Sequence, residues 1–293
     1  MKRRSPQNNT ASQQNRRAAF TLIELMIAIV IILILLGLLI PAIGAVRLRA
    51  QQAQVRTEIG NLEAAITAFK ADFGMDPPSG ITLYENQAGW NSDTRSKNLI
   101  RGMWPQFDFS KNRDINRDSD STDSFTLNAG ECLVFFLGGI WDSTNKTPNG
   151  FSKNPADPFI VSTAGGGRLG PYYEFNISRF VDIDNDNAPE YLDSFPSQQK
   201  PYLYFSSYDG RGYRIADEVV GTGMLDVYRQ GTDPTVTPPT NDVPFKAKSF
   251  QIISPGADFQ YGTGGIYNPD KNFPANRTEE VDNITNFVSG SLK

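Results

Sequence analysis

Alternating aspartates between residues 181 and 193 form the clearest candidate for a chemical site in the sequence. Asp182, Asp184 and Asp186 match positions 1, 3 and 5 of a calcium-binding loop, and Asp193 falls at position 12. Carboxylates at alternate positions of a tight loop can converge on one hard cation, and Ca²⁺ prefers six to eight oxygen ligands. The spacing predicts a calcium site, and the alternative is a solvated acidic turn.

Two features of this loop depart from the calcium-loop pattern. Asn187 stands where a turn glycine is usual, which asparagine tolerates because it visits the left-handed backbone region. Asp193 replaces the longer glutamate that would bind through both oxygens. Pro189 argues against a normal EF-hand helix after the loop, so we expect a calcium loop within a sheet domain. A weaker pattern at Asp114–Asp120 is interpreted as a solvated loop.

The composition argues against catalysis. The 293 residues include no histidine and a single cysteine, Cys132. The chain therefore cannot form an intramolecular disulfide, a Ser–His pair or a Cys–His pair. Nothing selects one carboxylate pair among the 32 acidic residues for glycoside or proton chemistry. We expect no enzymatic activity and interpret Cys132 as a core residue.

A further carboxylate stands at the start of the longest apolar run. Leu25–Val46 comprises 22 residues without a charge, and Arg47 ends the run. A helix of this length rises about 33 Å, enough to cross a hydrocarbon core of about 30 Å. An ionised Glu24 inside lipid would cost about 2.5–3.5 kcal/mol. It either reaches the membrane interface or pairs with a positive group in an assembly, such as the free amine that a cut before Phe20 would create.

The flanks of the apolar run set its orientation. The N-terminal flank contains no acid and five basic residues, Lys2, Arg3, Arg4, Arg16 and Arg17. This excess predicts that the N-terminus stays in the cytoplasm and that the chain after Arg47 lies outside. We expect a single transmembrane helix over residues 20–46.

Beyond the membrane span, the apolar residues keep a helical period. They are Val55, Ile59, Leu62, Ile66, Phe69 and Phe73, which are spaced by three or four residues. This spacing predicts one helix face in contact with a globular domain, rather than a coiled coil of only three heptads. Gly74 and Pro77-Pro78 end the helix. We therefore expect one helix over about residues 20–73, amphipathic over residues 47–74.

The remaining chain, residues 75–293, predicts an α+β domain. Residues 75–127 indicate a long irregular insertion with scattered aromatic side chains. Asn128 is expected to cap a short helix through Glu131–Leu137. Runs rich in aromatic and β-branched residues predict strands at Tyr172–Val181, Tyr202–Ser206 and Lys248–Ile253. A long N-terminal helix followed by a small antiparallel sheet is typical of the α+β class.

The string Ala19-Phe20-Thr21-Leu22-Ile23-Glu24-Leu25-Met26, directly before the apolar run, resembles the class III signal of type IV pilins and type II secretion pseudopilins, most closely the major pseudopilin. The resemblance implies a leader of residues 1–19, which prepilin peptidase removes before it methylates Phe20. It also implies that Glu24 aligns neighbouring subunits and that Pro41 loosens the helix. Ala19 departs from the usual glycine before the cut. An ordinary secretory signal would instead have its small-residue site after the apolar region.

The resemblance further implies a place and partners. It predicts a single-pass protein of the bacterial inner membrane whose C-terminal domain is periplasmic. Expected partners are prepilin peptidase, copies of itself and other pseudopilins, and an inner-membrane assembly platform with its ATPase. Without the leader the chain has 23 basic and 32 acidic residues, a net charge of −9. That charge argues against binding to a nucleic-acid backbone.

The resemblance also suggests a second calcium site near the C-terminus. Ser254-Pro255-Gly256-Ala257-Asp258 and the later segment from Asp282 resemble the closing segment of major pseudopilins, where a calcium-bound loop replaces a disulfide. The implied ligands are Asp258 and Asp282, and an insertion separates the two halves. The alternative is that both side chains only make hydrogen bonds within turns.

These patterns together predict a structural subunit of a pseudopilus that serves type II protein secretion. One alternative is a type IV pilin subunit for adhesion or DNA uptake. Another is a single-span membrane-anchored binding module. The absence of a cysteine pair and the calcium-like loops favour the secretion role.

Overall fold

The computed structural model describes residues 21–292 apart from 117–118, 143–146, 161–166, 216–221, 233–234 and 236–242. The expected leader, residues 1–19 with Ala19, and the expected methylation site Phe20 lie outside the described residues. The chain divides into two units, residues 1–49 and residues 50–293. Each unit is described by itself.

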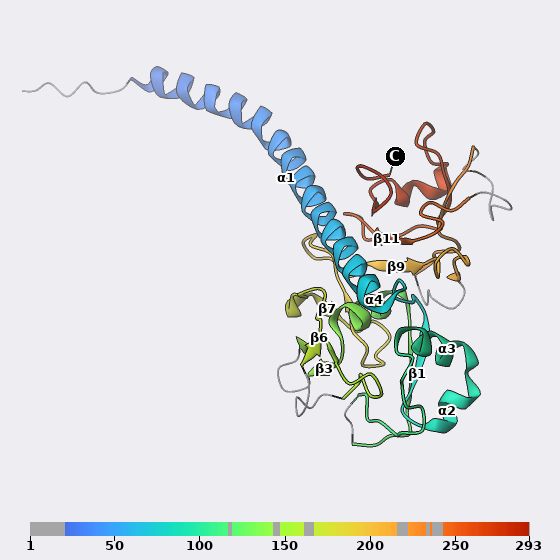
Figure 1. Ribbon diagram of the computed structural model, residues 1–293. Coiled ribbons are helices and arrows are strands. Elements are labelled where there is room, and N and C mark those ends of the chain that lie inside the picture. Colours follow the sequence, from blue (N-terminus) through green and yellow to red (C-terminus); the bar gives the residue numbers. More distant parts are fainter. Residues whose placement is uncertain are drawn as a thin grey trace, which may run out of the picture. The chain divides into compact units, whose positions relative to one another are not determined.

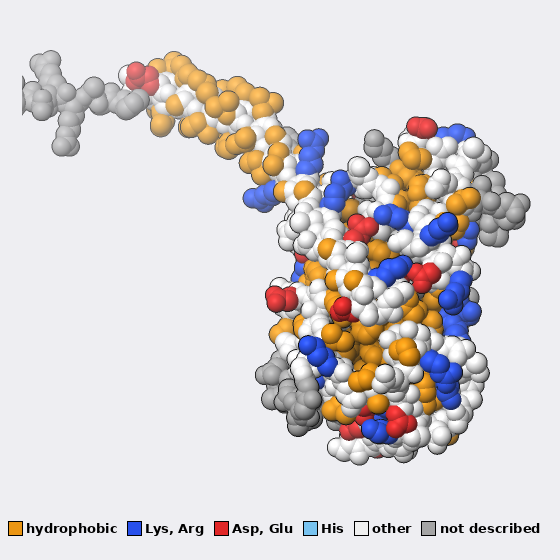
Figure 2. Space-filling model, viewed as in Figure 1, with side chains coloured by type: hydrophobic (Ala, Val, Ile, Leu, Met, Phe, Trp, Pro, Cys, Tyr) orange, Lys and Arg blue, Asp and Glu red, His pale blue; other side chains and the backbone are white. Residues whose placement is uncertain are grey.

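Helix α1, Leu22–Phe73, runs for 52 residues and confirms the predicted single long helix. Its backbone continues through Pro41, although proline has no N–H to donate to the preceding turn. The N-terminal half is covered with exposed hydrophobic side chains, as Figure 2 shows. At the other end, Gly74 adopts a positive φ of 76° and donates its N–H to the Lys70 carbonyl over 2.8 Å. This is the glycine stop that the sequence predicts.

The outer part of α1 belongs to the second unit, and its predicted apolar stripe is buried there. Val55, Ile59, Leu62, Ile66 and Phe69 are at most 2% exposed. Their burial confirms the expected contact between this helix face and the globular domain.

Helix α4, Ala129–Gly138, packs across this stripe. The ring of Phe69 lies 5.9 Å from that of Phe136, edge to face. Asn128 forms the expected cap, because its Oδ1 accepts the N–H groups of Gly130 and Glu131 while Glu131 Oε2 accepts the Asn128 N–H. This reciprocal capping box determines where α4 begins and how Glu131 is oriented. Cys132 is fully buried in the core, as expected.

The main sheet has three antiparallel strands in the order β13-β11-β9. Figure 1 labels β11 and β9, which lie side by side. They are β9 Leu203–Ser206, β11 Phe250–Ser254 and β13 Ile284–Thr285. Ile252 pairs with Tyr204, and every residue of the three strands is buried. Helix α4 contacts β9. Two of the three predicted strands, those around residues 202–206 and 248–253, are thereby confirmed.

Short strand pairs surround this core. The antiparallel pairs are β1 Ile81–Tyr84 with β2 Ser124–Leu127, β3 Trp141–Asp142 with β4 Thr147–Pro148, β5 Phe151–Ser152 with β6 Arg168–Leu169, and β7 Phe180–Val181 with β8 Glu190–Tyr191. One parallel pair joins β10 Tyr228–Gln230 to β12 Gly265–Tyr267. A long helix with small, mainly antiparallel sheets makes the fold α+β, as predicted.

The predicted strand at Tyr172–Val181 is mostly wrong. Only Phe180–Val181 is extended in a pair, and a 3₁₀ turn, η1 Ile177–Arg179, precedes it. Asn176 starts that turn because its Oδ1 accepts the N–H of Ser178 over 3.1 Å. The aromatic residues of the segment, Tyr172, Tyr173 and Phe175, pack against the core from irregular backbone. Their side chains satisfy the apolar pattern without a strand.

The insertion at residues 75–127 is more regular than predicted. Besides β1 and β2 it contains α2, Gln87–Ser92, and α3, Thr94–Met103. Asn86 and Asp93 cap these helices with their side-chain oxygens. Trp90 and Trp104 are buried in the domain core, so the aromatic side chains do anchor the insertion.

Candidate functional site

The first turn of α1 contains the expected assembly residue. Thr21 donates its backbone N–H and its Oγ1 hydroxyl to Glu24 Oε2, each over 2.8 Å. In return the Glu24 N–H reaches Thr21 Oγ1 over 3.3 Å. Within the part of the chain that the structure describes, no cation pairs with Glu24. The exposed carboxylate is therefore oriented by one threonine and accessible to a second molecule.

The helix surface that follows Glu24 is apolar and uncovered. Its large hydrophobic side chains between Leu22 and Leu48 are 40–77% exposed. Gly37 and Gly44 have no neighbouring atom within 4 Å of where a Cβ would lie. Among the described helices, α1 is the one long and apolar enough to cross a membrane. Such an apolar surface is stable only when lipid or other helices shield it from water.

The acidic loop between β7 and β8 folds around Asp182. Asp182 accepts the backbone N–H groups of Asp186 and Asn187 over 3.2 and 3.1 Å. Asn185 and Asn187 adopt positive φ angles of 61° and 71°. The tolerance expected of Asn187 for the left-handed region is thus confirmed. Asp182 acts as a turn-forming acceptor, and this fold determines where Asp184 and Asp186 lie.

The structure groups the carboxylates of this loop differently from the sequence prediction. Carboxylate oxygens of Glu131, Asp184 and Asp186 all lie within 4.8 Å of one another. Asp182 and Asp193, which the sequence placed in the same set, are not in this group. Glu131 was missed because it lies on α4, distant in sequence, and its local pattern indicates only a helix cap.

Asp193 belongs to a separate polar network in the core. It is 2% exposed, and its carboxylate accepts hydrogen bonds from Ser254 Oγ over 2.6 Å, Gln198 Nε2 over 2.8 Å and the Phe195 N–H over 2.9 Å. These donors use both of its oxygens. The expectation that Asp193 completes a calcium loop therefore does not fit its contacts.

The acidic cluster is electrostatically unfavourable in the absence of a cation. Burial raises the pKa of Glu131 to about 9, and repulsion from Asp186 and Asp184 contributes. Burial also raises the pKa of nearby Glu190 to about 7. Glu190 has weak donors, Asn128 Nδ2 at 3.3 Å and the Ile183 N–H at 3.2 Å. The ionised form of each group is disfavoured because little positive charge offsets its lost hydration.

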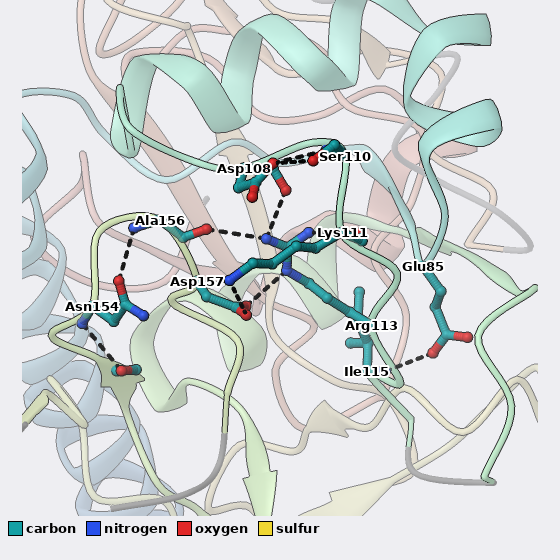
Figure 3. A network of polar contacts seen from close by, with 10 residues as sticks. Glu85, Asp108, Ser110, Lys111, Arg113, Ile115, Asn154, Ala156 and Asp157 are labelled. Carbon is teal, nitrogen blue, oxygen red and sulfur yellow. Dashed lines mark hydrogen bonds and ion pairs between the residues drawn. The ribbon is translucent and has the colours of Figure 1, made fainter. Parts of the chain in front are cut away.

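A second acidic group comprises Glu85, Asp120 and Asp123, and it has a structural role. Figure 3 shows the contact of Glu85 with Ile115. Glu85 accepts the N–H groups of Ile115 over 2.6 Å and Asp123 over 3.3 Å, and a longer contact of 3.4 Å comes from Asn116. Backbone donors therefore stabilise this carboxylate and organise the insertion.

The same region is anchored by Arg113, which is 7% exposed. Its Nε donates to Asp157 Oδ1 over 2.8 Å, and its Nη2 donates to the carbonyls of Asp108 and Ala156 (Figure 3). The guanidinium also lies over the Phe107 ring, 4.1 Å from its centre. This network connects the insertion to the loop that follows β5, and it requires no bound ligand.

Asp258 and Asp282 lie together, as the resemblance implies. Asp282 Oδ2 accepts the N–H groups of Ala257 and Asp258, the latter over 3.0 Å, and Asp258 Oδ1 accepts the Gln260 N–H over 2.8 Å. Burial and the neighbouring Asp282 raise the pKa of Asp258 to about 6. The bond from Gln260 to Asp258 lies within a turn, whereas Asp282 connects its own segment to the turn at Ala257 and Asp258. Calcium at this pair stays a prediction.

The closing segment also contains a buried ion pair that sequence reasoning missed. Arg277 and Glu280, in the 3₁₀ helix η3 Ala275–Glu280, are joined by bonds of 2.7 and 2.6 Å and are at most 1% exposed. Glu280 accepts the Thr263 N–H over 3.1 Å, and Arg277 donates to the Ile266 carbonyl over 2.8 Å. This pair connects the closing segment to β12 without a disulfide.

One comparison with known proteins gives a match. Residues 14–40 match the prokaryotic N-terminal methylation motif. Comparison with curated proteins and with solved structures gives no match. The matched residues include Glu24 and much of the exposed apolar part of α1, which is compatible with single-pass anchoring in a membrane. The chain therefore carries the N-terminal signal of a type IV pilin-like precursor that prepilin peptidase processes.

Proposed function

We propose that this chain is a structural subunit of a periplasmic pseudopilus that serves type II protein secretion. The observation that carries the proposal is a methylation motif over residues 14–40 that includes the start of an uncovered apolar helix. The first turn of this helix exposes the Glu24 carboxylate, which no cation pairs with among the described residues. A helix of this kind needs lipid before assembly and neighbouring helices after it.

In the proposed mechanism, the apolar helix exchanges its lipid neighbours for the helices of other subunits. Prepilin peptidase cuts between Ala19 and Phe20 and methylates the new amine. The amine of one subunit then pairs with Glu24 of its neighbour, which neutralises a charge that lipid disfavours. Pro41 would help the helix to bend as subunits pack, because its position lacks one backbone hydrogen bond. The inner-membrane platform and its ATPase would drive the subunits, with other pseudopilins, into a filament.

The globular domain supports a structural role. Its lone thiol, Cys132, is buried, and the chain contains no histidine. The carboxylates described above cap turns, form ion pairs or gather in the acidic cluster at Glu131. We therefore propose that the domain decorates the filament in the periplasm and catalyses no reaction.

One observation favours the membrane-anchored binding module as a second candidate. A cavity of about 550 Å³ opens beside Glu131 and is lined mainly by apolar side chains, among them Leu83, Val134 and Trp141. Cavities of this size and lining often bind small ligands. In that case the helix would only anchor the domain.

The deciding experiment examines processing and assembly together in native membranes. Mass spectrometry of the mature N-terminal peptide is expected to find methylated Phe20. Glu24→Ala should be processed normally but be absent from the assembled filament fraction. Glu63→Ala, which removes a partly buried acid paired with Lys246 further along the same helix, should be incorporated like the parent chain.

Two results would refute the assembly mechanism. One is an intact leader in the membrane fraction, and the other is normal incorporation of Glu24→Ala. Either result would make the anchored module the better account. If assembly is confirmed, a deletion strain separates the two filament roles. Loss of secreted proteins from the medium supports the pseudopilus, whereas loss of surface filaments supports a pilus.

A further inference from the structure

We propose that Glu131, Asp184 and Asp186 form a site for a divalent cation, Ca²⁺, that joins the first turn of α4 to the loop between β7 and β8. This site shares Asp184 and Asp186 with the aspartate loop that the sequence suggests, but Glu131 takes the place of Asp182 and Asp193. It is separate from the pair near the C-terminus. It does not depend on the proposed assembly mechanism.

The local folds on both sides bring the ligands together. On one side the capping box orients Glu131, because its Oε2 accepts the Asn128 N–H over 2.7 Å. On the other side the turn around Asp182 presents Asp184 and Asp186, which are exposed and partly buried respectively. One oxygen from each of the three carboxylates lies within 4.8 Å of the others, a spacing that a shared cation can bridge.

An independent observation comes from the second oxygen of Glu131. The residue is 1% exposed, yet its Oε1 has no hydrogen-bond partner. Buried polar atoms are nearly always satisfied, and an unsatisfied acceptor costs the full loss of its hydration. A cation held beside Asp184 and Asp186 would supply the missing interaction.

Among the described residues, no ion pair supplies the positive charge that a cation would bring to this cluster. Glu190, 4% exposed, adds a fourth carboxylate close by and repels Glu131 and Asp184. Across the described ranges, none of the ion pairs reaches any of these four acids. Like charges at this distance are stable only when they are protonated or when a cation neutralises them.

The donor set selects a hard cation. All the ligands are carboxylate oxygens, which suit Ca²⁺ and Mg²⁺ rather than metals that prefer nitrogen or sulfur. Ca²⁺ accepts irregular coordination and six to eight oxygens, whereas Mg²⁺ demands a near-ideal octahedron. The cavity that Glu131 lines also reaches Asp182 and Asn187 in the loop, so water can complete an irregular shell. The site therefore fits Ca²⁺ better.

The test is isothermal titration calorimetry. Metal is first removed from the full-length protein in detergent with EDTA, and CaCl₂ is then titrated into it. We expect Glu131→Gln and Asp184→Asn each to weaken one calcium site at least tenfold. Asp184 is exposed, so its variant keeps the test valid even if Glu131→Gln fails to fold. The same titration with MgCl₂ is expected to show weaker binding.

Two matched variants separate this site from the other acidic groups. Asp120→Asn, in the group around Glu85, should bind calcium as the parent protein does. Asp258→Asn reports on the pair near the C-terminus and should leave the site at Glu131 intact. The proposal is overturned if the parent protein binds no calcium up to about 10 mM, well above the range of weak extracellular sites. It is also overturned if the Glu131 and Asp184 variants bind calcium as the parent protein does.

Discussion

Replacing Glu58 by alanine tests how much a buried ion pair between the outer part of α1 and the rest of its domain contributes to stability. Both carboxylate oxygens of Glu58 pair with Arg179, over 2.6 Å to Nη1 and 2.8 Å to Nη2. The Tyr202 hydroxyl donates to the same carboxylate over 2.8 Å. The side chains of Glu58 and Arg179 are only 14% and 18% exposed, so water screens the pair weakly.

The expected loss in the free energy of unfolding is about 3 kcal/mol. Removing one partner of a buried ion pair costs about 3–5 kcal/mol, because the remaining charge stays buried without its partner. The lower end applies here. Arg179 would retain bonds to the Leu192 carbonyl and its position over the Tyr191 ring, 4.4 Å from the ring centre.

The measurement is urea unfolding of the full-length protein in detergent, followed by tryptophan fluorescence. The matched control is Asp209→Asn, which removes the charge from the exposed pair that Lys70 and Asp209 form over 2.7 Å. Those side chains are 40% and 37% exposed, so the control should lose less than about 1 kcal/mol. If Glu58→Ala loses no more than Asp209→Asn, burial does not strengthen the pair and the reasoning is refuted.

Three further substitutions test local backbone and capping effects in the same unfolding assay. Gly60→Ala should stabilise the protein by about 1 kcal/mol, because this exposed helical position has open space around it. Gly139→Ala should destabilise it by about 3 kcal/mol, because its φ is +87° and a Cβ would lie within 2.4 Å of the Gly150 backbone. Effects of equal sign at the two glycines would contradict this account. Asn128→Ala should cost about 1 kcal/mol by removing the cap of α4, and an unchanged urea midpoint would show that the capping box contributes nothing.

Some elements were predictable because their signals are local. The three-or-four spacing from Val55 to Phe73 and the stop at Gly74 are properties of a single helix, and the structure confirms both. Asn128 with Glu131 three residues later is a local capping pattern, which the structure also confirms. Such signals depend on neighbouring residues alone, so tertiary packing had little opportunity to override them.

The predicted strand at Tyr172–Val181 failed for the opposite reason. Its aromatic residues match a buried strand by composition, but pairing with a partner strand decides whether the backbone extends. Here Asn176 starts a turn and the side chains reach the core from irregular backbone. Composition indicates that these side chains are buried, but it does not determine the backbone conformation from which they reach the core.

The sequence by itself determined an apolar helix long enough to span a membrane, the apolar face of its outer half and the α+β class, because each depends on composition or short-range spacing. The methylation motif is carried by a short contiguous string, which is why its resemblance to known signals could be seen without a structure. Only the tertiary structure decided which carboxylates meet. It separated Asp193 into a core network and brought Glu131 from α4 to Asp184 and Asp186. The reason is physical: a ligand set is a property of three-dimensional distance, and folding places residues far apart in sequence within a few ångströms of one another.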